Sequence, residues 1–357
     1  MFRSIVISLV SFLSCPALFA QETNRTAPGA PGLDAHWPSA AKNGFGTSNT
    51  LASKVWFTLN NGVMTEVYYP TLDVPNVQTL QLIIVTPEGK VEIESQDTNH
   101  SLTVTDDARS LSFKQENTAK SGAYILTKAY VSDPERSCLL LRVFFKSWVH
   151  QSADYRIYVY YDPSLNNSGM HDSAWSEGGA LLAVDGDKAT ALVAEPGFAE
   201  TTNGYLGSSD GLTQLREASG FRNDYARAVE GNVVQVGRLS LPKIVLNNGI
   251  SFTLALGFGK NPATAHESAR ASLRKGFEAV RDRYQAGWHA YAAQLPTVES
   301  RHQRQFNMAA MVLKALEDKT YRGAMIASPS IPWGGGPNAN EPTISGYHAV
   351  GLAIFIR

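Results

Sequence analysis

The chain has 357 residues, of which 43% are hydrophobic and 10% aromatic, and its formal net charge at pH 7 is −1. This is the composition of a globular protein that is long enough for two hydrophobic cores. The near-neutral charge removes the electrostatic basis for binding nucleic acid or an anionic membrane surface, so neither is expected as a partner. No specific protein partner is predicted.

Residues 1–20 (MFRSIVISLVSFLSCPALFA) have the pattern of a signal peptide. Arg3 supplies a short positive region, an apolar stretch follows, and small residues precede position 21. We therefore expect an exported protein, periplasmic or secreted, that starts near Gln21 after cleavage. Cys15 leaves a lipoprotein signal as an alternative that fits the sequence less well. No later stretch has the roughly 18 apolar residues of a membrane span, so no span is predicted.

The next part of the chain is predicted to be a β-sandwich. Residues 21–35 are rich in Pro, Gly and small polar residues, which predicts a flexible lead-in. Residues 36–260 contain short β-branched and aromatic runs, such as Arg156–Tyr161, with no long helix between them. Apolar runs on both sides of Thr86–Gly89 (TPEG) and Asp185–Asp187 (DGD) indicate two hairpins. The pattern predicts a large antiparallel sandwich.

A helical pattern begins at Asn261-Pro262, where Asn can cap a helix and Pro is tolerated in its first turn. Apolar residues then recur every three or four positions as far as Tyr291, and Pro296 ends the pattern. We predict one long amphipathic helix over residues 262–295, within a helical linker of residues 261–296.

A second helix is predicted near residues 299–318. Its expected apolar face consists of Phe306, Ala310, Leu313 and Leu316. This helix begins a further region, residues 297–350, whose single helix and loop cannot bury an apolar face by themselves.

No complete catalytic constellation is visible in the sequence. There is no P-loop, no GxSxG elbow and no HExxH, and the eight histidines are scattered. Cys138 lies in an apolar run and is interpreted as a buried hydrophobic residue rather than a nucleophile. Asp185 and Asp187 could contact a cation, but turn chemistry explains them better, and Asp106-Asp107 is interpreted as a solvated loop pair. We predict no cofactor; a structural calcium ion is left open as an alternative, although no motif supports one.

The aromatic residues fall into two groups. One group lies in strand-like stretches, where packing in the core or across strands is expected: Trp56, Tyr68, Tyr69, Trp148 and Tyr158. Trp333 and Tyr347 instead lie in a glycine-rich loop, where aromatic faces can be presented to a ligand. Sugars suit such a loop, because their C–H faces pack on aromatic rings while their hydroxyls bind polar groups.

Two long stretches carry a resemblance to a known family. Tyr321–Gly334 (YRGAMIASPSIPWG), followed by Gly346–His348 (GYH), resembles the bacterial and archaeal glucoamylases and glucodextranases of glycoside hydrolase family fifteen. Trp56–Pro70 (WFTLNNGVMTEVYYP) is similar to the N-terminal domain of that group. The resemblance covers roughly residues 28–350, and its several long matches occur in the same order as in the family.

The resemblance implies an N-terminal super-β-sandwich, a helical linker and the start of an (α/α)6 barrel, over residues 36–260, 261–296 and 297–350. It also implies inverting hydrolysis of an α-glucan oligo- or polysaccharide, with glucose released from the non-reducing ends. In this chemistry one glutamate is the general acid and a second is the general base.

The family's Gly-Tyr-His stretch continues as Trp-Pro-Arg-Asp and lines the pocket for the terminal glucose. Tyr347 matches the family tyrosine, and we predict that Tyr347, Trp333 and His348 bind substrate. The match ends after Val350, where the family's Trp, Arg and Asp are replaced by Gly351, Ala353 and Ile354. Both family glutamates lie further downstream, so no residue here is predicted to be the acid or the base. The chain is expected to be a truncated N-terminal fragment that is inactive alone.

A shifted reading frame would explain residues 351–357. If codons for Val-Trp-Pro-Arg-Asp-Leu-Tyr-Lys-Met lose the T of TGG, one choice of codons translates as Val-Gly-Leu-Ala-Ile-Phe-Ile-Arg, the observed residues 350–357. Resequencing the gene across these codons tests this hypothesis.

Two other interpretations are kept. A non-catalytic carbohydrate-binding or structural β-sandwich protein would bind glucan without hydrolysis, although no aromatic row in the sequence marks such a face. A polysaccharide lyase also combines a super-sandwich with an α/α barrel. There the barrel normally comes first, and the matched loop motifs argue against it.

Overall fold

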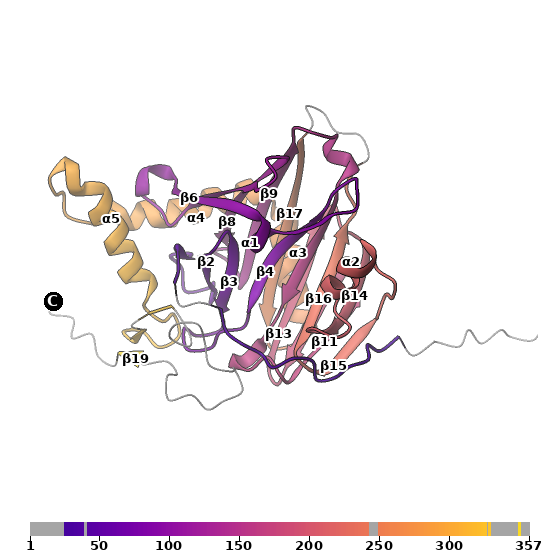
Figure 1. Ribbon diagram of the computed structural model, residues 1–357. Coiled ribbons are helices and arrows are strands. Elements are labelled where there is room, and N and C mark those ends of the chain that lie inside the picture. Colours follow the sequence, from indigo (N-terminus) through magenta and orange to yellow (C-terminus); the bar gives the residue numbers. More distant parts are fainter. Residues whose placement is uncertain (1–24, 39–40, 243–248, 327, 330–348, 351–357) are drawn as a thin grey trace, which may run out of the picture.

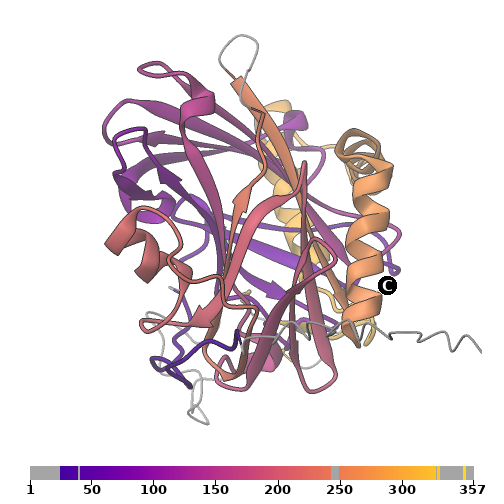
Figure 2. The same cartoon turned by 90° about the vertical axis from the view of Figure 1, so that its right-hand side faces the viewer.

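The structure is a computed structural model that describes residues 25–38, 41–242, 249–326, 328–329 and 349–350. Within these residues, two β-sheets lie face to face and the helices lie on the outside (Figures 1 and 2).

Every strand pairing within the two large sheets is antiparallel. The first sheet has eight strands in the order β1-β2-β3-β4-β10-β16-β14, with β5 paired to β4. Its strands are β1 Gly44–Thr47, β2 Trp56–Asn60, β3 Val63–Tyr68, β4 Thr79–Val85, β5 Val91–Ile93, β10 Arg156–Asp162, β14 Phe198–Tyr205 and β16 Val233–Leu239. The second sheet has nine strands in the order β15-β11-β12-β13-β17-β9-β8-β7-β6. Its strands are β6 Thr98–Val104, β7 Phe113–Ala119, β8 Tyr124–Ser132, β9 Cys138–Ser147, β11 Asp172–Glu177, β12 Ala180–Asp185, β13 Lys188–Glu195, β15 Arg227–Gly231 and β17 Gly249–Gly259. The predicted antiparallel sandwich is confirmed.

The hairpin predictions are confirmed as well. The TPEG turn joins β4 to β5, with Val85 opposite Val91, and the DGD turn joins β12 to β13, with Val184 opposite Ala189. Both turns place glycine at positive φ, 86° for Gly89 and 55° for Gly186, which L-residues rarely adopt.

The main core lies between the two sheets. Phe57, Leu82 and Tyr161 of the first sheet share one buried cluster with Leu141 and Leu254 of the second. The alternation of strand side chains sends the neighbouring residues to the outer faces, where helices cover part of them.

Most single-residue predictions in the strands are confirmed. Trp56, Tyr68 and Tyr158 have no exposed surface, and Cys138 is likewise buried, which raises the pKa of its thiol to about 12. The prediction for Trp148 is wrong, because it follows the end of β9 and its side chain is 56% exposed.

Helices cover part of the outer face of each sheet (Figure 2). Helix α2 (Gly211–Ala218) packs Leu215 against Ile83 and Tyr158 of the first sheet. Helix α3 (Pro262–Lys275) lies on β17 and β13 of the second sheet. A Cβ at Gly257 of β17 would lie 2.2 Å from the carbonyl oxygen of Ala265, so only glycine lets this helix approach so closely.

The predicted long helix is two helices. Helix α3 ends and α4 (Phe277–Ala292) begins at Gly276, whose φ of 84° is incompatible with a continuous helix. The spacing from Leu273 to Phe277 keeps the helical period across this break, which hides it in the sequence pattern. The predicted start is confirmed, with Asn261 and Thr264 forming a reciprocal cap.

The second predicted helix corresponds to α5 (Ser300–Ala315), but its buried face is different. Met311 and Ala315 are buried, whereas Leu313, which was predicted to be buried, is 60% exposed. The buried face of α5 is determined by its contact with the sandwich, and the periodicity of the helix sequence alone does not show where that contact lies. No helix in the described ranges is long and apolar enough to cross a membrane.

Several short elements complete the described structure. They are α1 Glu94–Asp97, the 3-10 helices η1 Asp106–Ala108, η2 Ser152–Asp154 and η3 Leu165–Asn167, and the paired strands β18 Met325–Ile326 and β19 Ala349–Val350.

Residues 25–35 of the segment expected to be a flexible lead-in pack against the second sheet. Thr26 forms a parallel bridge with Arg227 of β15, and Arg25 binds the side chain of Asp224 at 2.5 Å. Ala27 and Ala35 are buried. The composition of residues 21–35 suggested flexibility, but backbone hydrogen bonds to β15 hold this part of the segment in place.

A buried ion pair joins the two sheets. Lys128 Nζ of β8 lies 2.6 Å from Glu94 Oε1 and donates a hydrogen bond to the carbonyl oxygen of Gly62, between β2 and β3. Glu94 also accepts hydrogen bonds from Asn117 Nδ2 and from the backbone N–H of Leu82. Both charged side chains are almost completely buried, so each stabilises the charge of the other in a place where water cannot.

We expect Lys128→Met to lower the free energy of unfolding by about 3–5 kcal/mol, because it leaves the Glu94 carboxylate buried without its counter-ion. Urea unfolding followed by circular dichroism measures the loss. The double variant Lys128→Met/Glu94→Gln removes both charges and should be more stable than the single variant. A single variant as stable as the wild type would contradict this account.

Candidate functional site at the junction of sandwich and helices

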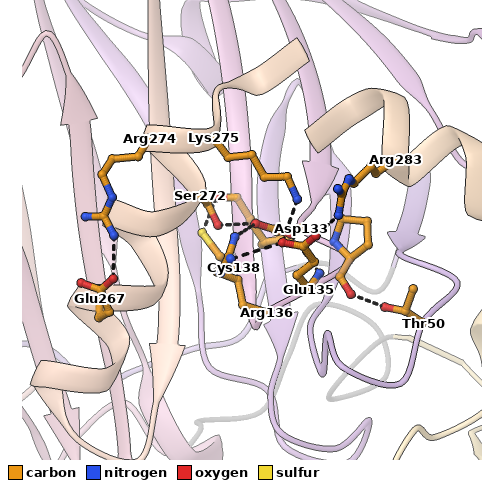
Figure 3. A network of polar contacts seen from close by, with 12 residues as sticks. Thr50, Asp133, Glu135, Arg136, Cys138, Glu267, Ser272, Arg274, Lys275 and Arg283 are labelled. Atoms are coloured by element: carbon orange, nitrogen blue, oxygen red, sulfur yellow. Dashed lines mark hydrogen bonds and ion pairs between the residues drawn. The ribbon is translucent and has the colours of Figure 1, made fainter. Parts of the chain in front are cut away.

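A buried carboxylate connects the sandwich to the helices where α3 meets α4 (Figure 3). Asp133 lies in the turn between β8 and β9, and its Oδ2 accepts a 2.7 Å hydrogen bond from Ser272 Oγ of α3. The same carboxylate binds the Arg136 guanidinium, and its Oδ1 accepts a hydrogen bond from the backbone N–H of Glu135 at 2.9 Å. The thiol of Cys138 lies against Ser272 in the same cluster. Because Asp133 is fully buried, these donors are required for its charge.

A second carboxylate in this turn binds the helices from the solvent side. The Glu135 carboxylate lies 2.8 Å from Nζ of Lys275, which is the last residue of α3. It also binds the guanidinium of Arg283 on α4. The Glu135 side chain is 38% exposed, so solvent weakens these ion pairs and they orient the helices more than they stabilise them.

Helix α4 is anchored by hydrogen bonds from its buried aromatic residues. Trp288 Nε1 donates to the carbonyl oxygen of Thr47 at 2.8 Å, and Tyr284 OH donates to the carbonyl oxygen of Leu111 at 2.8 Å. Asn49 Nδ2, in the loop between β1 and β2, donates to the carbonyl oxygen of Gly287 at 3.1 Å. The helix is therefore fixed by directional bonds as well as by apolar packing.

The chain that leaves α5 is held against the first sheet. Trp56 Nε1 donates to the carbonyl oxygen of Ala315 at 3.0 Å. Asp318 Oδ2 accepts from the backbone N–H of Leu72 at 2.9 Å, while its Oδ1 accepts from the N–H groups of Thr320 and Tyr321. One carboxylate thus shapes the turn after α5 and attaches it to the sandwich.

Lys319 is inserted into the same region. Its ammonium group donates to Thr47 Oγ1 and to the carbonyl oxygen of Ser53, both at 2.6 Å, and lies 4.8 Å from the centre of the Trp56 ring. Burial lowers the pKa of Lys319 well below its usual value.

Glu317 forms a compact charged cluster beside Lys319. It binds Lys314 and Arg322, and its Oε1 accepts a 3.1 Å hydrogen bond from the N–H of Gly323. Burial alone would raise the pKa of Glu317, but hydrogen bonds from Lys314, Arg322 and Gly323 lower it to about 2. A carboxyl group that is ionised down to this pH cannot act as a general acid at neutral pH.

The sandwich also holds the chain that leads into the glycine-rich loop. Tyr68 OH, at the end of β3, donates a 2.6 Å hydrogen bond to the carbonyl oxygen of Pro329. Strand β18 pairs with β19, with Met325 opposite Val350. The two ends of the intervening loop are therefore next to each other.

A cavity of about 210 Å³ lies where these parts meet. It is lined by the loop between β1 and β2, by Trp288, and by residues from Lys314 to Arg322. It is smaller than the roughly 300–1,000 Å³ of typical ligand sites. Its charged groups already have partners, so the junction is suited to holding the loop rather than to binding a sugar itself.

The predicted substrate-binding residues Trp333, Tyr347 and His348 lie outside the described residues, so the structure does not test their predicted role.

No group of three or more His, Cys, Asp or Glu side chains in the described part of the chain is placed to hold a metal ion. Asp187 forms an ion pair with Lys188 in its turn. The interpretation of Asp106 as solvated is wrong, because its side chain is 14% exposed and binds His289 of α4.

Sequence reasoning missed the residues that build the junction. Asp133, Ser272 and Lys319 stand alone in the sequence among ordinary turn and helix residues. The Asp133-Pro134 turn is a local signal for a hairpin, but nothing in the sequence indicates that its carboxylate would bind a helix 139 residues away.

The fold and the junction define a class of protein, a double-sheet antiparallel sandwich that supports a following helical region and the base of its first loop. The chain belongs to the family described as glucodextranase, domain N, whose sequence model matches residues 27–293.

Two relatives extend the similarity through the junction. A glucoamylase from Clostridium sp. (strain G0005) is 33% identical over 331 residues, which are 92% of this chain and 46% of that protein. The crystal structure of a bacterial glucoamylase complexed with acarbose matches with a TM-score of 0.83 and 33% identity, and the match covers 90% of this chain and 47% of that one. The chain therefore spans about half the length of these relatives. The resemblance to glucoamylases and glucodextranases is confirmed.

The Glu317 cluster predicts a pH dependence of stability. Because its pKa in the folded protein, about 2, lies below its ordinary value of 4.5, ionised Glu317 contributes fully above pH 4.5 and loses its contribution as the pH falls toward 2. We expect the thermal midpoint of wild type minus that of Glu317→Gln to be larger at about pH 6 than at about pH 3.

The matched control is Glu278→Gln, which removes an exposed carboxylate that pairs with Arg281 on α4. Its difference from wild type should be small at both pH values. A Glu317→Gln difference that stays constant from pH 6 to pH 3 would rule out the proposed cause.

Proposed function

We propose that this chain is the N-terminal part of an exported, exo-acting α-glucan hydrolase of the glucoamylase and glucodextranase type. The observation that carries the proposal is the continuity of the match, since the 331 residues aligned at 33% identity amount to 92% of the chain. The acarbose complex of the bacterial glucoamylase supports an α-glucan oligo- or polysaccharide as the substrate.

The proposal divides the chain into a sandwich domain of residues 36–260, a helical linker of residues 261–296 and the start of an (α/α)6 catalytic domain at residues 297–350. Helix α5 would be the first helix of that domain. In support, Leu313 on α5 is exposed beside an open hollow of about 660 Å³ that Tyr291 and Met325 also line. Such an apolar surface is suited to packing against further helices.

The proposed reaction is inverting hydrolysis that releases glucose from non-reducing ends. Trp333, Tyr347 and His348 are the proposed contacts to the terminal glucose. The acid and the base would be supplied by parts of the protein outside these 357 residues. In support, the junction carboxylates Glu317 and Asp318 are fully engaged in ion pairs and backbone hydrogen bonds.

The sandwich and linker would contribute rigidity to this reaction. Tyr68, Trp56 and Lys319 fix the chain on the way to the loop, and a sugar-binding loop with a fixed base loses less entropy when it binds. Export is proposed on the sequence of residues 1–20 alone.

The purified 357-residue chain should release no measurable glucose from maltodextrin or dextran in a glucose-oxidase assay. A chimaera that joins residues 25–350 to the remaining half of the Clostridium glucoamylase should release glucose. In that chimaera Tyr347→Ala should lower kcat/KM by about 100-fold, because substrate is misplaced by the loss of a pocket wall.

Tyr321→Ala is the matched control, since Tyr321 is an exposed tyrosine outside the loop. It should leave kcat/KM within about twofold of the parent chimaera. Glucose release by the 357-residue chain itself, abolished by Tyr347→Ala, would overturn the proposed division of labour.

A further inference from the structure

A groove of about 640 Å³ lies on the second sheet at strands β11 and β15. It is lined by Ser173–Glu177 and by Ala226–Val229. Helix α3 packs on the neighbouring strands β12, β13, β17 and β9, and no residue of α3 lines the groove. In Figure 1, β11 and β15 lie on the opposite side of the sandwich from α5.

Strand alternation determines which side chains face the groove. Ala174 and Ala228 are opposite each other, and both are buried in a cluster with Tyr205 on the inner face. Trp175 and Arg227 are the next opposed pair, so they point to the outer face. There Trp175 packs partly against Leu182 of β12, and the rest of its indole borders the groove.

Polar groups flank this indole. Trp175 Nε1 donates a 3.0 Å hydrogen bond to Glu177 Oε2, which fixes the orientation of the ring. The exposed guanidinium of Arg227 has no hydrogen-bond or ion-pair partner among the described residues. Its backbone, however, is held by the 2.8 Å hydrogen bond from the N–H of Ala27 to its carbonyl oxygen. The groove thus presents an oriented indole, with a guanidinium opposite it on β15 and a carboxylate two positions along β11.

This chemistry fits a carbohydrate. The C–H face of a pyranose packs on an indole, and its hydroxyls can bind a neighbouring guanidinium and carboxylate. A nucleic acid is disfavoured because Glu177 accompanies the single guanidinium in the groove and the near-neutral net charge of −1 provides no attraction for phosphates. An added β-strand is disfavoured because residues 25–27 already pair with β15.

We propose that the groove at Trp175, Glu177 and Arg227 is a surface site for an α-glucan chain, separate from the glycine-rich loop. The assignment of an α-glucan in particular rests on the proposed function. A polysaccharide held at this site would be kept close to the protein between encounters with the pocket, which raises its effective concentration. Short oligosaccharides, which cannot bind both places at once, gain nothing from it.

The test is affinity electrophoresis of the 357-residue chain in gels that contain soluble starch, with isothermal titration of maltoheptaose for the affinity. Trp175→Ala should weaken binding by at least about tenfold. Trp148→Ala removes an exposed tryptophan outside the groove and should bind like wild type. Arg227→Ala removes an exposed side chain that has no partner within the described ranges, so the fold should be unchanged, and the substitution should weaken binding by about threefold or more.

Wild-type protein that does not bind starch or maltoheptaose would overturn the proposal. So would Trp175→Ala and Arg227→Ala variants that bind like wild type, or a Trp148→Ala variant that loses as much affinity as Trp175→Ala. Preference for cello-oligosaccharides over malto-oligosaccharides would overturn the α-glucan assignment.

Assays of the chimaera test the surface site and the proposed hydrolase function independently of each other. Trp175→Ala should leave its maltotriose turnover unchanged and reduce its activity on starch, and an equal loss on both substrates would overturn the surface site. A chimaera that is inactive while the chain still binds starch through Trp175 would refute the hydrolase proposal and leave the surface site standing.

Discussion

The position of the helices on the sandwich depends on the buried carboxylate of Asp133. A charge in that place is tolerated only when its oxygens are occupied, and Ser272 of α3 provides one of the hydrogen bonds. This hydrogen bond holds the turn between β8 and β9 next to the end of α3, where Gly276 breaks the helix. Once α3 and α4 are fixed, Trp288 brings the loop between β1 and β2 into contact with α4, and that loop in turn receives Lys319.

The parts of the fold that follow from local rules could be predicted from the sequence. Alternating apolar residues and turn glycines define hairpins such as β4–β5 and β12–β13, and the Asn261 cap defines the start of α3. The break at Gly276 could not be predicted, because the apolar period continues across it. The buried face of α5 could not be predicted either, since it depends on which surface of the sandwich the helix meets. The junction residues act across more than a hundred positions, and local sequence patterns do not show which residues so far apart will meet.

Two regions of the sandwich differ in how far their polar side chains are bound by other protein groups. At the junction, polar side chains such as Asp318 and Glu317 are saturated with protein partners, which makes that region rigid and leaves little capacity for a ligand. At β11 and β15, by contrast, the Arg227 guanidinium binds no other side chain or carbonyl in the part of the chain that the structure describes, and Trp175 is only partly covered. Under the two proposals, the first region would position a catalytic region and the second would bind a polymer.

The contact between residues 25–27 and β15 has a consequence for how the chain folds during synthesis. Arg25 binds Asp224, 199 positions later, so residues 25–27 leave the ribosome long before their partner strand exists. Contacts of such high sequence separation form late, because a large loop must close first. We therefore expect residues 25–27 to join the edge at β15 late in folding. A short-lived intermediate with this edge open would be the state most exposed to proteases and to association with other chains.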